Sequence, residues 1–411
     1  MAIEARNLVI GSTLLHSDMP PVLGNTVQLQ GEAYYQIAHY DQMPPFFMSL
    51  VSSADHWLFI SSSGGLTAGR IDSDSALFPY ETEDKITAHS EQSGSKTIVR
   101  VNRGGQISLW EPLCDRYASI YRCERYLYKN VTGNKLIFEE RNLDLQLTIR
   151  TAWRTSERFG FIKSSWLQND GDQTCRIELL DGLQNLMPYG ATEALQTSFS
   201  SLLQAYKRNE LDPSTGLGFF SLSATLTDRA EPSESLKTTA AWQNGLENPR
   251  YLLCNDQVDA FRLGRGLTQE LDLRGKVGAY FVNSAFELLL GQSRQWHIAA
   301  DVNQDSAAVV RLRQLLSQDQ ALIEQEIEAS IDRGTAELVR YVAAADGLQL
   351  SAQETTTAHH FANTLFNIMR GGLFAAGYQV EREDLRDFLQ VRNRAVLQAH
   401  EDWFSALPAE I

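Results

Sequence analysis

Two short clusters of polar and aromatic residues contain the side chains best suited to binding a sugar. The first follows the apolar stretch 56–60, and the second follows the apolar run that ends at Leu180. Flat aromatic rings cover the C–H groups of a sugar, while carboxylates, amides and guanidinium groups hydrogen-bond to its hydroxyls. We therefore predict that ligand contacts come from Trp57, Arg70, Asp72, Asp181, Gln184, Asn185 and Tyr189.

Each cluster also has a plain structural interpretation. The first would then be a turn-rich surface loop beside a core tryptophan, because loops are polar for many reasons. In the second, Asp181-Gly182 would be a turn that the following residues cap. The sequence leaves both interpretations open.

Other patterns that could support chemistry each lack a necessary residue. The run 64–71 has the glycine spacing of a phosphate loop, but Arg70 and Ile71 stand where a lysine and a hydroxyl residue are needed. The histidines form no zinc-binding pattern, and no G-x-S-x-G motif occurs. We expect no metal and no cofactor, and no catalytic residue can be named. Acidic pairs such as Glu139-Glu140 are expected on solvated faces.

The composition is that of an ordinary globular protein with excess negative charge. Of its 411 residues 43% are hydrophobic and 21% are charged, and the formal net charge is −15. A field of this sign repels phosphate backbones and anionic lipids, so we expect neither nucleic acid nor a membrane as partner. Four scattered cysteines and an N-terminus without a secretion signal predict a cytoplasmic location.

The pattern of residues 1 to about 300 predicts strands. Apolar and polar residues alternate strictly over residues 143–150, as in a half-buried strand. Glycine- and asparagine-rich segments at 103–105, 131–134 and 169–172 predict hairpin turns. Successive hairpins without intervening helices indicate an antiparallel sandwich. The stretch from about 205 to 248 is rich in Ser, Thr, Asn, Pro and Gly, and is predicted to contain a long loop or an insertion that crosses the sandwich.

After about residue 305 the apolar spacing becomes helical. One amphipathic helix, which Gly334 could interrupt, is predicted from the spacing of Val309, Leu312, Leu316, Ile323, Ile327 and Ile331. A second helix is expected from about Thr355 to Met369, ended by Gly371-Gly372, and a third from about Arg382 to Phe404. The prediction is therefore a β-sandwich over residues 1–303 followed by a helical linker over residues 304–411.

Four segments resemble the cellobiose phosphorylase and cyclic-glucan phosphorylase superfamily of glycoside phosphorylases. They are residues 176–190, 274–281, 296–302 and 360–372. The resemblance spans most of the chain but includes no motif of catalytic specificity. It implies a mainly β fold, a large antiparallel supersandwich like that of galactose mutarotase, followed by C-terminal α-helices that lead toward an (α/α)6 barrel. In the family the catalytic acid lies on that barrel, which this sequence does not include.

The resemblance suggests a non-catalytic N-terminal region that binds carbohydrate and assists assembly. The parent protein would be a glycoside phosphorylase or hydrolase acting on glucosides or β-glucan oligosaccharides, and the sandwich could form a homodimer. A second hypothesis is a self-contained sugar enzyme, similar to a mutarotase or epimerase, with a general acid and base. A third is a purely structural dimerisation module. A buried histidine–carboxylate pair in a cleft would favour the second hypothesis.

Overall fold

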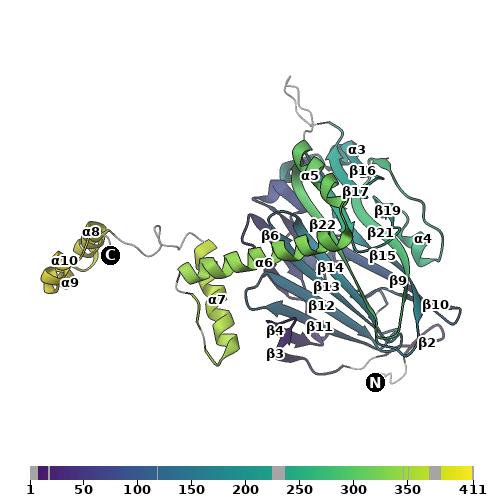
Figure 1. Ribbon diagram of the computed structural model, residues 1–411, viewed down its shortest axis with the longest axis horizontal. Helices are drawn as coiled ribbons and strands as arrows, with labels where there is room; N and C mark the ends of the chain where they lie inside the picture. Colours follow the sequence, from purple (N-terminus) through teal and green to yellow (C-terminus); the bar gives the residue numbers. More distant parts are fainter. Residues whose placement is uncertain are drawn as a thin grey trace, which may run out of the picture. The chain divides into compact units, whose positions relative to one another are not determined.

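Antiparallel strands form most of the chain up to residue 305 (Figure 1). The computed structural model describes residues 8–16, 19–117, 119–224, 237–345, 347–349, 351–369 and 381–409. The largest sheet has eleven strands, in the order β20 (Asp272–Arg274), β16 (Lys207–Asp212), β17 (Leu217–Leu222), β18 (Lys237–Asn244), β22 (Ser293–Asp305), β14 (Gly160–Asn169), β13 (Leu147–Ser156), β12 (Lys135–Asn142), β11 (Cys123–Asn130), β4 (Glu32–Ala38) and β3 (Leu23–Leu29).

Three smaller sheets complete the β structure. The five-stranded sheet has the order β10 (Gln106–Trp110), β9 (Gly94–Arg103), β15 (Cys175–Leu186), β21 (Gly278–Leu288) and β19 (Arg250–Leu252). The four-stranded sheet comprises β5 (Phe47–Leu50), β6 (His56–Ser61), β7 (Leu66–Arg70) and β8 (Ala76–Phe78). A two-residue pairing joins β1 (Val9–Ile10) to β2 (Thr13–Leu14). Short helices in the connections are α1 (Glu83–Ala88), α2 (Glu193–Ser198), α3 (Ser200–Tyr206) and α4 (Val258–Arg262).

Period-two alternation gives the eleven-stranded sheet an inner and an outer face. On β13, Leu147, Ile149 and Trp153 belong to the main hydrophobic core, which also includes residues of the five-stranded and four-stranded sheets. Thr148 and Arg150 alternate with them and therefore lie on the opposite face, which we call the outer face. The predicted fold class is confirmed: the chain is mainly β, with large antiparallel sheets followed by C-terminal helices.

Two local predictions about the strands are wrong. The segment 169–172 does not close a hairpin, because β14 before it lies in the eleven-stranded sheet and β15 after it lies in the five-stranded sheet. Asn169 holds this crossing by donating its side-chain Nδ2 to the carbonyl oxygens of Gln173 and Leu288 at 2.8 and 3.1 Å. The alternating stretch 143–150 becomes strand only from Leu147, because residues 143–146 form the turn between β12 and β13.

Much of the stretch 205–248, which was predicted to contain a long loop or insertion, is strand. It contributes β16, β17 and β18 to the eleven-stranded sheet, while residues 225–236 lie outside the described residues. The other two predicted turns are confirmed as hairpins, between β9 and β10 and between β11 and β12. The polar strand residues Asn209 and Asn244 are buried, and each donates its side-chain amide to a backbone carbonyl oxygen, of Leu253 and Gln320 respectively.

Two helices cover part of the outer face (Figure 1). They are α5 (Ser306–Leu316) and α6 (Gln320–Ala344), where one helix was predicted. The break falls at residues 317–319, where the Asp319 carboxylate accepts the backbone N–H of Ala321 at 2.8 Å, as an N-cap does. Gly334 lies within α6 and does not interrupt the helix. A second hydrophobic cluster joins these helices to β14, β17, β18 and β22 through Ile162, Leu217, Ala240, Trp242, Ala299, Leu312, Leu315, Ile323, Ile327 and Ile331.

The chain divides into two compact units, residues 1–335 and residues 336–411. In the second unit, α7 (Glu354–Met369) matches the predicted helix, while Gly371-Gly372 lies outside the described residues. The predicted third helix is divided into α8 (Arg382–Arg392), α9 (Arg394–Ala399) and α10 (Glu401–Ala406). The first division occurs at Asn393, whose side chain caps α9. No helix within the described residues is long and apolar enough to span a membrane.

A buried ion pair lies between the eleven-stranded and five-stranded sheets. Lys163 of β14 and Asp181 of β15 are each 0% exposed, and the Lys163 ammonium donates to Asp181 Oδ1. Trp296 Nε1 donates to the other carboxylate oxygen at 2.7 Å, and Thr97 Oγ1 donates to Oδ1 at 2.6 Å. Burial lowers the pKa of Lys163. Asp181 therefore connects four strands, β9, β14, β15 and β22, inside the core.

We expect Asp181→Asn to lower the free energy of unfolding by about 3 kcal/mol, because removing one partner leaves the Lys163 ammonium buried without a counter-charge. The double variant Lys163→Met/Asp181→Asn should recover part of that loss, since no charge then remains in the core. Urea unfolding at neutral pH measures both. A single variant that matches the wild type within about 1 kcal/mol would contradict the predicted role of the pair.

Candidate functional site

Aromatic and charged side chains form a continuous row across the outer face. The register pairs Trp166 of β14 with Arg150 of β13, Arg150 with Glu139 of β12, and Glu139 with Tyr126 of β11. Residues directly opposite each other on one face have Cβ atoms about 5 Å apart, so these four side chains are successive neighbours. Antiparallel register thus gathers residues that the sequence separates by up to forty positions.

Glu139 pairs with two arginines, Arg150 in the same row and Arg141 in the neighbouring row of side chains. Its carboxylate is 0% exposed and accepts Arg141 Nε at 2.7 Å on one oxygen and Arg150 Nε on the other. The arginine side chains themselves are 42% and 39% exposed. Neither guanidinium has a terminal nitrogen hydrogen-bonded to another described residue, although Arg141 lies over the Tyr126 ring at 4.5 Å. Burial opposes the charge of Arg141, but Glu139 outweighs it and raises the pKa.

Tyrosines border the arginines on β11. Tyr126 donates its hydroxyl to Glu124 at 2.8 Å, and burial together with this bond raises the pKa of Tyr126 to about 12. The Tyr128 hydroxyl, one row away, accepts Gln36 Nε2 at 3.0 Å. Both rings are stacked, with centroids 6.5 Å apart. The result is an aromatic border with neutral phenol groups beside the two cations.

Two adjoining hollows lie along this row. One has a volume of about 230 Å³ and includes Tyr34, Ile137 and Trp166, and the other, of about 450 Å³, includes Arg141 and Asp170. Both are lined by Thr148, Arg150 and Gln168. Together they fall in the size range of small-molecule sites.

Strong curvature of the sheet encloses the smaller hollow. Leu29 and Gln30, at the β3–β4 turn, line it together with Ser293 of β22. In the sheet order β22 and β3 are separated by β14, β13, β12, β11 and β4. Residues so far apart in the sheet reach one hollow only because the sheet curls, so this part of the outer face is concave.

The rim of the larger hollow is acidic at one point. Asp170 accepts Thr148 Oγ1 at 2.5 Å and Gln168 Nε2 at 2.8 Å, one on each carboxylate oxygen. The side chains facing the hollows therefore combine guanidinium donors, an amide, a hydroxyl, a carboxylate and an indole. This is the set of groups that can cover the C–H face of a sugar and hydrogen-bond its hydroxyls.

A buried polar chain lies beside the row, beneath α6. Glu328 accepts Arg154 Nη1 and Nη2 at 2.6 and 2.7 Å, and Arg154 also donates to the hydroxyl of Ser164. That hydroxyl lies 2.8 Å from His297 Nδ1. His297 is 1% exposed, and burial lowers its pKa to about 4. The hydrogen bonds between Arg154 and Glu328 fix α6 to the sheet, and burial keeps the His297 imidazole neutral at pH 7.

The buried histidines do not support acid–base catalysis. His297 contacts Ser164 and Gln295, and His56, whose pKa burial lowers to about 3, contacts the hydroxyl of Ser52. Neither ring touches a carboxylate among the described residues. His89 does contact Glu81 at 3.0 Å, but its side chain is 39% exposed. The buried histidine–carboxylate pair expected of a mutarotase-like enzyme is therefore absent from the described part of the chain.

The first predicted cluster is divided between the two faces of the four-stranded sheet, because the register places Trp57 opposite Gly69 and Arg70 opposite His56. Trp57 Nε1 donates to the carbonyl oxygen of Asp72 at 3.2 Å, and the Asp72 carboxylate accepts the backbone N–H of Asp74. Arg70 donates to both carboxylate oxygens of Asp301 at 2.7 and 3.0 Å and to Asp55 at 2.6 Å. With a side chain only 13% exposed, Arg70 ties β7 to β22 and has little freedom to meet a ligand.

The second predicted cluster is divided between the core and the surface. Asp181 and Gln184 are 0% and 1% exposed, so neither reaches solvent. Asn185 adopts a positive φ of 60° where the pairing of β15 with β21 shifts register. Tyr189 follows the strand and is half-buried, with the Lys237 ammonium 5.5 Å from its ring centre. These positions favour the structural interpretation of Asp181 and Gln184, while Asn185 and Tyr189 remain candidates.

Sequence reasoning missed the residues of the concave face. The alternating stretch 143–150 contains Thr148 and Arg150 on its polar side, and Trp166 and Gln168 alternate in the same way on β14. An arginine and a tryptophan on the polar side of neighbouring strands were the available signal. The pair Glu139-Glu140 is not solvated as predicted: Glu139 lies on the outer face, and Glu140 lies inside, accepting Trp110 Nε1 at 2.7 Å.

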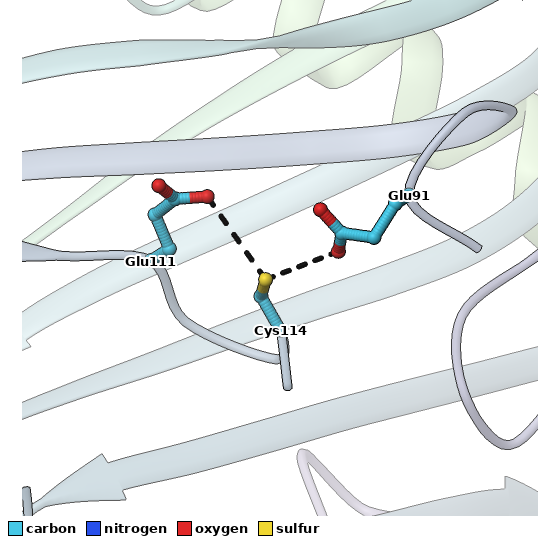
Figure 2. Close-up of side chains that lie close together, drawn as sticks. All are labelled: Glu91, Glu111 and Cys114. Atoms are coloured by element: carbon cyan, nitrogen blue, oxygen red, sulfur yellow. Dashed lines mark hydrogen bonds between the residues drawn. The ribbon is translucent and has the colours of Figure 1, made fainter. Parts of the chain in front are cut away.

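A separate cluster consists of Cys114, Glu91 and Glu111 (Figure 2). The Cys114 thiol lies between the carboxylates, 3.0 Å from Glu91 and 3.9 Å from Glu111. Burial and the bond to Glu91 raise the pKa of Cys114 to about 12, so it stays a thiol at neutral pH. Glu91 already pairs with Lys96 at 2.7 Å, and Glu111 accepts Arg262 at 2.5 and 2.9 Å.

These cations make the cluster a poor metal centre. A metal ligand must be the thiolate rather than the thiol, and both carboxylates already have a counter-charge. Cys114 also borders a hollow of about 830 Å³, whose lining includes Trp110, Arg125 and Glu140. Arg125 donates to Glu140 at 2.8 Å, so these polar groups are already engaged with one another.

No family model and no curated protein matches the chain. Among solved structures, it is similar to a polysaccharide lyase (13% identity, TM-score 0.35, 64% of this chain and 33% of that one). It is also similar to a bacterial glucoamylase complexed with acarbose (10%, 0.36, 82% and 42%). A third is a GalM/aldose epimerase homologue from C. elegans (9%, 0.34, 64% and 100%). The chain thus spans less than half the length of the first two.

All three TM-scores lie below 0.5, so the fold class is assigned from the sheets and helices themselves. The predicted membership of the cellobiose phosphorylase superfamily stays a prediction.

We expect the stability of the protein to fall by about 2 kcal/mol between pH 7 and pH 5 on account of His297 alone. Its folded pKa is lowered to about 4 from an ordinary 6.5, so at pH 5 the unfolded chain binds a proton that the folded chain does not. Urea unfolding at both pH values should show a smaller fall for His297→Gln than for the wild type. His359→Gln, at an exposed position on α7, is the control, and equal falls in all three proteins would contradict the prediction.

Proposed function

We propose that the concave part of the outer face binds a carbohydrate. The single observation that supports this function best is the row Trp166, Arg150, Glu139 and Tyr126 along two adjoining hollows. The row and the neighbouring Arg141 combine an indole and a phenol ring with two guanidinium groups whose terminal nitrogens have no hydrogen-bonded partner among the described residues. These N–H groups are available to donate hydrogen bonds to the hydroxyl groups of a sugar.

Binding without catalysis is the form of this function that the geometry favours. General acid–base work needs a group whose pKa lies near neutrality within reach of the substrate. The carboxylate of Glu139 is fixed between two guanidinium groups, and His297 is buried and neutral. We therefore propose that the chain acts as a carbohydrate-binding region of a larger glycoside phosphorylase-like or hydrolase-like protein, in keeping with the resemblance noted from its sequence.

A second candidate site lies on the four-stranded sheet and includes the predicted Trp57. Four rings follow one another there: Phe47 stacks on Phe59 with centroids 5.4 Å apart, and Phe59 stacks on Trp57 at 6.2 Å. Tyr80 meets the Trp57 ring edge-on at 5.6 Å. Phe47 and Tyr80 are 39% and 49% exposed, so this row offers a sugar a flat apolar surface but few polar partners.

We expect Trp166→Ala to weaken saccharide binding about tenfold or more, equivalent to about 1.4 kcal/mol, because the ring would no longer cover the ligand. Titration calorimetry with a panel of glucosides and β-glucan oligosaccharides measures the affinity, and thermal unfolding checks that the variant is folded. Trp57→Ala is the matched control. Loss of binding in Trp57→Ala but not in Trp166→Ala would move the site to the four-stranded sheet.

A further inference from the structure

Charge is unevenly distributed along the proposed binding row. Glu139, Arg141 and Arg150 form a group of two cations and one anion, which leaves one net positive charge. The group lies beside the larger hollow, in a protein whose formal net charge is −15. Asp170, on the same hollow, brings the sum of these four charges to zero, so an anionic ligand is favoured by the free N–H groups of the two arginines and not by net charge.

The two guanidinium groups are arranged to meet a ligand. Each is held through Nε by the same buried carboxylate, which fixes the direction of the planar group. The four terminal nitrogens are left without a hydrogen-bond partner among the described residues, and both side chains line the larger hollow. Held in this way, a guanidinium presents parallel N–H donors that match the two oxygens of a carboxylate.

We propose that the saccharide bound on this face carries a carboxylate, as a hexuronate does, and that Arg141 and Arg150 bind it. The inference rests on the proposed function and specifies its ligand class. The carboxylate would accept hydrogen bonds from the free N–H groups of the arginines, while the uronate ring would lie toward Trp166, the direct neighbour of Arg150 on β14.

Charge balance favours a carboxylate over a phosphate ester. A carboxylate brings one negative charge to this hollow, whereas a phosphate ester brings up to two. Asp170 lies on the same hollow and accepts bonds only from the neutral Thr148 and Gln168, so it adds repulsion for a second charge. The ligand class is therefore a uronate-containing oligosaccharide.

The test compares each uronate oligomer with its own methyl ester, which keeps the ring and linkage but removes the charge. Trigalacturonate, a glucuronate-containing trisaccharide and trimannuronate are titrated calorimetrically into the full chain, each beside its ester, with glucose 6-phosphate as a further probe. Arg150→Gln and Arg141→Gln remove one cation each. Arg340→Gln, 68% exposed on α6, is the control for an equal loss of charge.

We expect at least one uronate to bind tenfold or more tightly than its ester, and the difference to shrink severalfold in Arg150→Gln and Arg141→Gln but not in Arg340→Gln. The advantage should also fall between 50 and 500 mM NaCl in the wild type, a readout that needs no variant to fold. Equal affinity for acids and esters, with Trp166→Ala still weakening both, would overturn the carboxylate and leave the proposed function standing. Tighter binding of the sugar phosphate would also overturn it, and no binding of any saccharide would overturn both proposals.

Discussion

The buried carboxylate of Asp181 is the point on which the sandwich depends. It accepts the Lys163 ammonium, Trp296 Nε1 and Thr97 Oγ1, so four strands of two sheets meet at one fully buried charged group. A charge can be kept in a core only when its partners are fixed in geometry, because its desolvation costs several kcal/mol. The pairing of the sheets is thus specified by polar contacts as well as by apolar packing, and a sheet slipped by one residue would leave Lys163 and Asp181 without each other.

Because the two sheets are held in register, the outer face of the eleven-stranded sheet can have two parts with different roles. Over β17, β18, β22 and the start of β14, apolar residues meet α5 and α6, and the Arg154–Glu328 pair adds a polar tie. Farther along the sheet, β11, β12 and β13 carry arginines and tyrosines, and the curl of the sheet brings the β3–β4 turn over them. One continuous sheet therefore serves as a helix-packing surface at one side and as a concave polar surface at the other.

The adjacent residues Glu139 and Glu140 have different electrostatic roles on the two faces of the sheet. Glu140 points into the core and holds Trp110, Leu113 and Arg125, while Glu139 points outward and holds Arg141 and Arg150. Each is almost fully buried, yet each is fully partnered, in accordance with the cost of burying a charge without hydrogen bonds. The difference is that the arginines on the outer face keep free donors, whereas the inner network is closed on itself. The arginines on the outer face therefore have N–H groups available to bind a ligand.

The amino-acid sequence by itself determined the fold class, the predominance of strands up to about residue 300 and the onset of the helical region, because alternation and helical spacing are local patterns. It also singled out Trp57 and Arg70 on the neighbouring strands β6 and β7, which the register places on opposite faces of their sheet. Only the tertiary structure decided that 169–172 crosses between sheets, that Asp181 is a core residue, and that Trp166, Arg150, Glu139 and Tyr126 are neighbours. The reason is physical: cross-strand register and sheet curvature arise from contacts between distant segments, and no local pattern records which strand lies beside which.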